Sequence, residues 1–227
     1  MNIIARIYND FPTKFGIPRQ SGRVKELTGK IVFEKEYRND EALRGIEQFS
    51  HLWLIWEFSE NTGSEWSPTV RPPRLGGNKR IGVFASRSPF RPNPIGISCV
   101  KLESVEKTDN EGTVLIVSSA DLMNGTPIYD IKPYIPYSDC IPNATGGYAE
   151  AHSGDKAEVE IADALLERLP QDKRKALIEV LKDDPRPAYQ HDEERIYGFP
   201  FAGFEIKFKA NENAISVIDI IEIKKNG

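Results

Sequence analysis

The chain has few of the residues that build metal centres and thiol chemistry. Only two cysteines and three histidines occur among 227 residues, and Cys99 and Cys140 are too far apart to form a CxxC motif. His51, His152 and His191 are scattered in the same way, so no zinc-ligand spacing is recognisable and we expect no metal site. Cys99 lies in an apolar stretch, where we expect a small core residue rather than a nucleophile.

Long apolar segments are also missing. The longest uninterrupted apolar run, Leu52–Trp56, is far shorter than the roughly 20 residues that a membrane-spanning helix needs. The first residues, Met-Asn-Ile-Ile-Ala-Arg, do not form a signal-peptide pattern. We therefore expect a cytoplasmic protein without a membrane partner.

Several common enzyme motifs are absent from the sequence. No GxGxxG follows a predicted strand, which argues against a Rossmann dinucleotide site or a Rossmann methyltransferase. Residues 76–79 (GGNK) lack the spacing and the hydroxyl residue of a P-loop, and there is no GxSxG or HExxH. The length leaves room for one large domain, or for a domain of about 150 residues and a smaller one.

What the chain does have is one segment of concentrated positive charge, which we call the basic window. Between Trp66 and Leu102 there are seven Lys and Arg residues and no Asp or Glu. The whole chain has 30 basic and 34 acidic residues, so the remainder has 23 against 34, a net charge of −11. Such focusing favours binding of an anion, because the local field attracts a polyanion. The alternative is a solvated connector whose arginines only keep the chain soluble.

The backbone of the basic window is stiff. Six prolines and four glycines exclude a helix and leave two short β-type runs, Ile81–Ala85 and Ile95–Val100. The prolines restrict the φ angles around residues 86–93, so the polar side chains of this turn are held at a small entropic cost. Such a turn can present hydrogen-bond donors to a phosphate, a carboxylate or a ribose.

Hydrophobic patterns predict that the chain is mainly β. The run His51–Phe58 is apolar almost throughout, as in a strand that is buried on both faces, and Asn124-Gly125 predicts a turn. Six to eight strands with one small helix up to residue 137 are typical of an antiparallel barrel or sandwich. The expected helix is Glu41–Phe49, and the expected strands are Asn2–Tyr8, Lys30–Glu34, His51–Phe58, Ile81–Ala85, Ile95–Val105, Thr113–Ser119 and Ile128–Tyr134.

Composition changes between residues 136 and 155, and we place a domain boundary there, with one domain over residues 1–142 and a second over 143–227. Two helices are expected in the second domain, Lys156–Arg168 and Gln171–Lys182, separated by Pro170. A hairpin of Phe204–Lys209 and Ile215–Lys224 follows. The second domain is thus predicted to be a small α+β domain, of a size that often needs a partner surface.

Three stretches are more specific than these patterns. They are PTVRPPRLGGNKRIGVFASRSPFRPNPIG (68–96), DLMNGTPIYDIKPYIPY (121–137) and DPRPAY (184–189). Together they resemble the TrmO, or TsaA-like, family, whose bacterial members are S-adenosylmethionine-dependent tRNA methyltransferases. The resemblance covers nearly the whole chain, more loosely at the C-terminus. It implies an antiparallel β-barrel methyltransferase, not of the Rossmann type, that works as a homodimer and methylates N6 of threonylcarbamoyladenosine at position 37, beside the anticodon of tRNA.

The resemblance also implies, by matching motif, which residues bind S-adenosyl-L-methionine. An arginine can pair with the carboxylate of this cofactor, Phe58 could offer its adenine an apolar face, and Asp121 could accept from its ribose or amino group. An Asx-turn or a cap is the alternative role for Asp121. The family commonly has Asp where this chain has Asn124, to which we give no acid–base role. The implied cofactor residues are Pro18, Arg19, Gln20, Phe58, Ser59, Arg87, Ile97, Ser118, Ser119, Ala120 and Asp121.

The substrate that the resemblance implies poses a chemical problem. Its N6 is a ureido nitrogen with a delocalised lone pair, so it is a poor nucleophile until it loses its proton. We hypothesise that a carboxylate or a tyrosine near the transferred methyl group takes or orients that proton. The two tyrosines of the second motif could instead be core residues of a strand. The candidates are Asp121, Tyr129, Asp130 and Tyr134.

An anticodon stem-loop would suit the basic window, because backbone contacts position RNA while loop bases are recognised by stacking and edge contacts. Two other functions remain open. One is a barrel that binds the cofactor or RNA without catalysis, and the other is a methyltransferase of the same fold that acts on another substrate. The residues expected to contact phosphate are Arg71, Arg74, Lys79, Arg80, Arg91 and Lys132.

Overall fold

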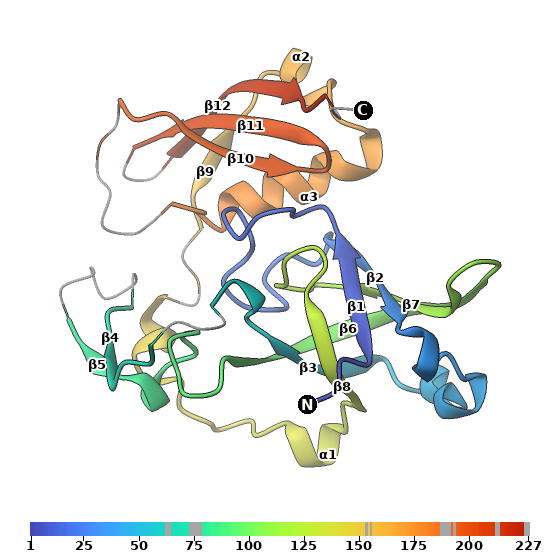
Figure 1. Cartoon of the computed structure of the whole chain (residues 1–227). Coiled ribbons are helices and arrows are strands. Elements are labelled where there is room, and N and C mark those ends of the chain that lie inside the picture. Colours follow the sequence, from blue (N-terminus) through green and yellow to red (C-terminus); the bar gives the residue numbers. More distant parts are fainter. Residues whose placement is uncertain are drawn as a thin grey trace.

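The computed structural model describes residues 1–61, 65–72, 79–152, 154, 156–186, 192, 194–211 and 214–224 (Figure 1). Within these ranges six antiparallel strands form a closed barrel, in which each strand is hydrogen-bonded to its neighbours and the last strand pairs again with the first. The order is β1 (Ala5–Asn9), β2 (Thr28–Phe33), β7 (Gly112–Ser118), β6 (Ile95–Thr108), β3 (His51–Glu57) and β8 (Pro127–Pro133). The mainly β prediction is confirmed.

The interior of the barrel is filled by alternate side chains of its strands. In β3 every second residue is buried, and Leu52, Leu54 and Trp56 are 0%, 0% and 6% exposed. The intervening residues of β3 are only half-buried, so the prediction of a strand buried on both faces is wrong. The reason is that a closed barrel gives each strand one inner and one outer face.

Two other predictions before residue 137 are corrected by local backbone geometry. The expected helix Glu41–Phe49 is replaced by two short 3₁₀ helices, η2 (Asp40–Leu43) and η3 (Ile46–Gln48). Gly45 separates them with a φ of 88°, which a continuous helix cannot contain. The expected strand Ile81–Ala85 is divided into β5 (Ile81–Gly82), which pairs with β4 (Thr69–Val70), and the 3₁₀ helix η6 (Val83–Ala85).

The C-terminal part contains a four-stranded sheet in the order β10 (Tyr197–Phe201), β11 (Phe204–Ala210), β12 (Ala214–Glu222) and β9 (Glu158–Glu160). The predicted helix Gln171–Lys182 is confirmed as α3, and the predicted hairpin is confirmed as β11 and β12. The predicted helix Lys156–Arg168 is wrong. Residues 158–160 pair in parallel with β12 instead, which leaves only the one-turn helix α2 (Asp163–Leu166).

Short helices occupy several of the connecting segments. Each has six residues or fewer. They are η1 (Lys35–Tyr37), η4 (Ser59–Asn61), α1 (Pro136–Asp139) and η7 (Gly147–His152).

The two sheets enclose separate cores, but the segment that joins β1 to β2, residues 10–27, lies in the second core. Phe11, Val24 and Leu27 are buried against side chains of α3, β10, β11 and β12. The ring centroids of Phe11 and Phe201 are 5.2 Å apart. We call residues 10–27 the bridging loop; Figure 1 shows it in blue, between the barrel and α3. The C-terminal core is therefore completed by an N-terminal segment.

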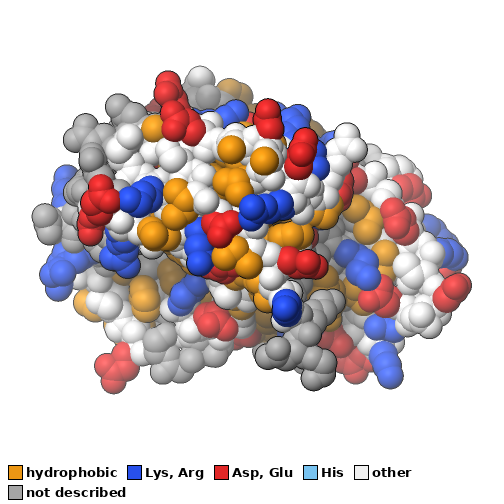
Figure 2. Space-filling model, turned by 90° about the horizontal axis from the view of Figure 1, so that it is seen from above, with side chains coloured by type: hydrophobic (Ala, Val, Ile, Leu, Met, Phe, Trp, Pro, Cys, Tyr) orange, Lys and Arg blue, Asp and Glu red, His pale blue; other side chains and the backbone are white. Residues whose placement is uncertain are grey.

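The surface over the C-terminal sheet has a mixed character. Figure 2 looks onto this part of the molecule and shows acidic and basic side chains interspersed, with apolar side chains between them. Ile218 and Ile221 of β12 are among the exposed apolar residues, at 41% and 40%. Charge of one sign does not dominate this face.

Among the described residues, no helix is both long and apolar enough to cross a membrane. Within the same residues, no group of three or more His, Cys, Asp or Glu side chains is arranged to hold a metal ion.

Candidate active site

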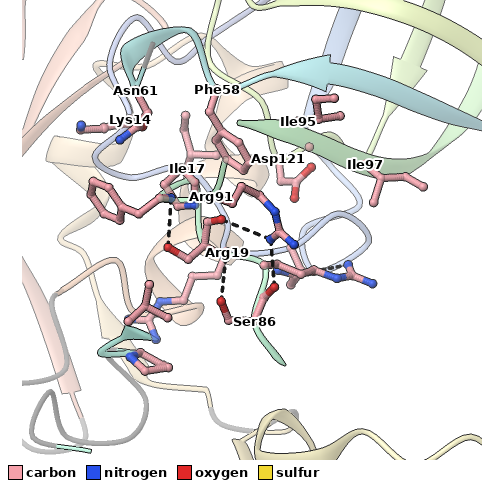
Figure 3. Close-up of a pocket in the computed structure, with 18 of the residues that line it drawn as sticks. Lys14, Ile17, Arg19, Phe58, Asn61, Ser86, Arg91, Ile95, Ile97 and Asp121 are labelled. Atoms are coloured by element: carbon pink, nitrogen blue, oxygen red, sulfur yellow. Dashed lines mark hydrogen bonds between the residues drawn. The ribbon is translucent and has the colours of Figure 1, made fainter. Parts of the chain in front are cut away.

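A large cleft opens between the bridging loop, one end of the barrel and the basic window. Its volume is about 1620 Å³. Residues from five parts of the chain line it: the bridging loop, the end of β3 with the residues up to Asn61, the segment from 67 to 97, the turn that follows β7, and the segment from 146 to 149. Figure 3 shows Ile95 and Ile97 projecting from β6, with Phe58 and Asp121 beside them and Arg19 and Arg91 closer to the centre of the view.

A chain of hydrogen bonds fixes the carboxylate of Asp121 in this cleft. The Ser98 hydroxyl donates to Oδ1 of Asp121 at 2.5 Å, and Nε1 of Trp56 donates to the Ser98 hydroxyl at 2.9 Å. Trp56 reaches Ser98 because residue 96 is glycine: a Cβ there would lie 2.3 Å from the indole ring. The ring of Phe58 lies against Trp56, with centroids 4.3 Å apart. Side chains of strands β3 and β6 therefore fix the position of the Asp121 carboxylate.

The environment of Asp121 opposes ionisation more than it favours it. Burial raises the pKa of the Asp121 carboxyl above its ordinary value. Hydrogen bonds from the Ser98 hydroxyl and from the backbone N–H groups of Asp121 and Ser21, together with the charge of Arg87, lower that pKa and only partly offset the burial. A carboxyl group with a raised pKa in a cleft is a suitable proton acceptor.

The residues just before Asp121 support it from outside the cleft. Ser119 has a φ of 67°, a left-handed conformation that its backbone contacts stabilise. Its N–H donates to the carbonyl of Leu27 at 2.9 Å, and its carbonyl accepts from Gly22 at 3.0 Å. The Ser118 hydroxyl donates to Glu103 at 2.5 Å. Ser118, Ser119 and Ala120 are buried and do not line the cleft, although they were predicted together with the cofactor residues.

The other predicted cofactor residues all line the cleft. In the bridging loop, Arg19 donates to the carbonyls of Asp184 (3.2 Å) and Arg186 (2.8 Å). Gln20 accepts from Arg87 of the basic window, so this pair connects two walls of the cleft. The lining set is Pro18, Arg19, Gln20, Phe58, Ser59, Arg87, Ile97 and Asp121.

The predicted phosphate-binding residues divide into two groups. Arg71, Arg80 and Arg91 line the cleft, and Arg91 is held by the carbonyls of Ser86 and Ser88 at 3.0 and 3.3 Å. Of the remaining three, Lys79 and Lys132 are not among the lining residues. Lys79 is exposed, Lys132 pairs with Asp130 at 2.8 Å on β8, and Arg74 lies outside the described residues.

Of the four candidate proton acceptors, only Asp121 lines the cleft. Tyr134 packs against His51 and Trp53, with ring centroids 6.2 and 5.8 Å away. Burial and a hydrogen bond to Glu57 raise the pKa of Tyr129 to about 12, so this phenol keeps its proton at neutral pH. Asp130 is paired with Lys132, as described above.

Sequence reasoning missed the residues that position Asp121 and part of the cleft lining. Trp56 and Ser98 were counted only within expected strands. The glycine within β6 was a usable signal, because a glycine in a strand often marks the close approach of another group. Phe84, Phe90 and Tyr148 also line the cleft. Asn124, which received no acid–base role, accepts a hydrogen bond from the N–H of Asn9 at 2.9 Å.

Comparison with known proteins identifies the family. The family model described as tRNA-methyltransferase O N-terminal domain matches residues 6–140, and the TrmO C-terminal domain model matches residues 155–223. The chain belongs to the TrmO family. Its barrel, bridging loop and C-terminal sheet are thus those of a TrmO protein.

Individual relatives agree with this family. The chain is 40% identical over 222 residues to the tRNA (adenine(37)-N6)-methyltransferase of Escherichia coli K12, covering 94% of both chains. It is 43% identical to a protein of the same name from Eikenella corrodens, over 76% of this chain and 97% of the relative. A crystal structure of TrmO from Pseudomonas aeruginosa has a TM-score of 0.78 at 32% identity, and 96% of this chain and 94% of the other are covered.

Proposed function

We propose that this protein transfers a methyl group from S-adenosyl-L-methionine to N6 of threonylcarbamoyladenosine at position 37 of tRNA, next to the anticodon. Relatives that match 94% and 76% of the chain carry the name tRNA (adenine(37)-N6)-methyltransferase, which supports tRNA as the substrate. The structural observation that carries the proposal is the half-buried carboxylate of Asp121, fixed by Ser98 in a cleft that several arginines also line.

The residues of the cleft fit the cofactor. When bound, S-adenosyl-L-methionine supplies an already activated methyl group on a sulfonium cation. Guanidinium groups such as that of Arg87 suit its carboxylate, and the half-buried ring of Phe58 offers its adenine an apolar face. Asp121 provides the negative charge that suits a cation or a ribose hydroxyl. Ligand sites usually have volumes of about 300–1,000 Å³, so this cleft leaves space for a second reactant.

The chemistry of the substrate assigns a role to Asp121. The N6 proton must leave before or as the nitrogen attacks, and a carboxylate of raised pKa is suited to accept it. Ser98 holds this carboxylate by a hydrogen bond and is itself held by Trp56, so the carboxylate does not need to reorient during the reaction. Transfer of the methyl group otherwise requires alignment and exclusion of water. The remaining candidates, Tyr129, Asp130 and Tyr134, take no part in this proposal.

The tRNA is proposed to lie along the basic side of the cleft. Arg71, Arg80 and Arg91 would contact phosphates of the anticodon stem-loop. Phe84 and Phe90 are 74% and 46% exposed there and offer faces for stacking with unpaired loop bases. Exposed aromatic rings interleaved with arginines are typical of surfaces that bind single-stranded RNA.

We further propose that the protein acts in the cytoplasm as a homodimer, with domains over residues 1–142 and 143–227. The division is supported by the two family models, which leave residues 141–154 between them. The bridging loop crosses this division, because it belongs to the first domain by sequence and to the second by packing.

The decisive experiment offers the protein and labelled S-adenosyl-L-methionine to two tRNA pools, one with and one without the threonylcarbamoyl group. Nucleoside mass spectrometry then identifies the product. We expect methyl gain on the modified pool alone. Methyl gain on the unmodified pool would show that the enzyme acts on adenosine without the threonylcarbamoyl group. Cofactor binding without gain on either pool would favour a binding protein or an enzyme for another substrate.

A further inference from the structure

The bridging loop is anchored in the C-terminal domain by packing. Phe11 is 2% exposed within the C-terminal core, and the ring of Phe15 meets that of Phe199 edge-on at 6.1 Å. Gly16 has a φ of 96°, and a Cβ on it would come within 2.4 Å of the Phe199 ring. Any side chain larger than hydrogen at Gly16 is therefore strained. This end of the loop cannot shift without disturbing the C-terminal core.

A second anchor is polar and lies at the end of α3. Arg23 forms an ion pair with Asp183, and the two side chains are only 15% and 5% exposed. Arg19 contacts the residues that follow Asp183, because its guanidinium group donates to the carbonyls of Asp184 and Arg186. Such carbonyls form a fixed cradle for a guanidinium group only if the backbone that carries them is rigid.

The segment Asp183–Arg186 has the features of a rigid cradle. Both nitrogens of the Arg186 fork, Nε and an Nη, donate to the two carboxylate oxygens of Asp184 at 2.9 and 3.0 Å. Arg186 is 8% exposed, and Asp184 has a φ of 48°, a conformation that its contacts must maintain. The Asp184–Arg186 pair thus orients the carbonyls that receive Arg19. Asp184, Pro185 and Arg186 are the first residues of the DPRPAY motif, which has no role in the chemistry proposed for the cleft.

The opposite face of the bridging loop meets the cleft. The Ser21 hydroxyl accepts from the N–H of Cys99 at 3.2 Å, and the Ser21 N–H donates to the Asp121 carboxylate. Gly22 donates to the carbonyl of Ser119, and Gln20 accepts from Arg87. Residues 19–23 therefore contact the Asp183–Arg186 cradle on one side and Asp121 on the other.

We propose that the segment Asp183–Arg186 is a positioning element for the cofactor site. It touches neither cofactor nor RNA; it holds the bridging loop so that Pro18, Gln20 and Ser21 face Asp121 in the geometry that binds S-adenosyl-L-methionine. The inference rests on the proposed function, because it assigns the cofactor to this side of the cleft. It gives the C-terminal domain a role in cofactor affinity. The outward face of that domain mixes both signs of charge, which does not suit a phosphate backbone (Figure 2).

Two variants test the cradle in the full-length protein. Asp183→Asn weakens the ion pair with Arg23, and Arg186→Lys keeps the charge but loses the forked contact with Asp184. We expect each to raise the Kd for S-adenosyl-L-methionine about tenfold, measured by calorimetry without tRNA, because misplacement of a supporting group propagates to the site. The Kd for tRNA should stay within about twofold, and kcat at saturating cofactor should stay close to that of the wild type.

Asp219→Asn is the matched control, because Asp219 pairs with Arg168 at 2.8 Å in the same domain but is not part of the bridging-loop contacts described above. It should leave the Kd for the cofactor unchanged. Unchanged cofactor affinity in both cradle variants would overturn the inference, and a selective loss of tRNA affinity would assign the segment to RNA binding. If Asp183→Asn does not fold, Arg186→Lys alone decides. A wild-type protein that does not bind the cofactor would overturn the proposed function as well.

Discussion

One wall of the cleft, formed by residues 17–20, Arg23 and Asp121, is supported from behind by the buried residues Ser98, Ser118 and Ser119. A second wall, residues 67–72 and 79–91, presents exposed side chains: Phe84 is 74% exposed and Phe90 46%. The hydrogen bonds described in this second wall run largely within it, as from Arg91 to Ser86 and from Arg80 to Thr69. The first wall is instead tied to strands β3, β6 and β7 and to the C-terminal domain. We call them the held wall and the exposed wall.

This difference separates two kinds of recognition. A small cofactor has few atoms with which to order a binding site, so its site gains affinity when the cost of ordering has already been met during folding. A large RNA brings many phosphates and bases, and it can order exposed side chains as it binds. We therefore expect substitutions in the held wall to act on stability, cofactor affinity and rate, and those in the exposed wall to act on RNA affinity.

The largest expected effect comes from Asp121→Asn in the held wall. Loss of the proton acceptor should lower the single-turnover rate of methyl transfer by about 10²- to 10⁴-fold at saturating cofactor and tRNA. Asp130→Asn is the control, because its carboxylate is exposed and paired with Lys132 outside the cleft. A rate for Asp121→Asn within about threefold of the wild type would remove Asp121 from the proton-transfer step.

Glycine substitutions compare the strand β6, which supports the held wall, with the exposed wall. Gly96→Ala places a Cβ 2.3 Å from the Trp56 ring and should lower the free energy of unfolding by about 1–3 kcal/mol, as overpacking does. Gly82→Ala in the exposed wall meets nothing within 4 Å and should change it by no more than about 0.5 kcal/mol. Urea denaturation measures both. Equal losses would contradict the contrast between the walls.

Arginine substitutions in the exposed wall should act on RNA alone. Arg71→Ala and Arg80→Ala are each expected to weaken tRNA binding and to reduce the slope of log K against log salt by about 0.7–0.9. The Kd for S-adenosyl-L-methionine should not change. Lys132→Ala is the comparison, since Lys132 lies away from the cleft and should leave the slope unchanged. A salt-independent affinity for tRNA would exclude phosphate contacts from this wall.

The smallest effect concerns pH. Because burial raises the folded-state pKa of Asp121 above its ordinary value of 3.8, the folded protein holds this proton more tightly than the unfolded chain does. Stability from this group is therefore present below the unfolded pKa and is lost as pH rises through the folded pKa. Asp121→Asn should remove this decline, so its stability relative to wild type should increase with pH above about 4, as thermal unfolding would reveal. A difference that is constant with pH would contradict the burial of this charge.

Local patterns in the sequence predicted the elements whose partners lie nearby. Helix Gln171–Lys182 has its apolar residues at helical spacing and ends before Pro185, so its bounds follow from sequence alone. Residues 158–160 join a sheet through parallel pairing with Ala214–Ser216, more than 50 positions away, and no local pattern contains that information. The helix predicted there was wrong for this reason.

The candidate site was predictable in its composition but not in its geometry. Motif matching grouped Asp121, Tyr129, Asp130 and Tyr134 because they are close in sequence. The structure brings only Asp121 into the cleft, since Tyr129 and Asp130 lie on the strand β8 and Tyr134 just after its end, in different surroundings. The contact between Ser98 and Asp121 joins β6 to the turn after β7 and requires these two strands to pair.

The bridging loop has a consequence for the timing of synthesis. Arg19 and its acceptor in Arg186 are 167 residues apart in the chain, and the core around Phe11 also needs β12, which ends at Glu222. A ribosome that adds about 5–20 residues per second needs roughly 10–40 s to make the chain between Phe11 and Glu222. The barrel strands are complete much earlier, after Pro133. The nascent protein therefore has a barrel before it has a finished cofactor wall, and the enzyme becomes competent only when the last strand has left the ribosome.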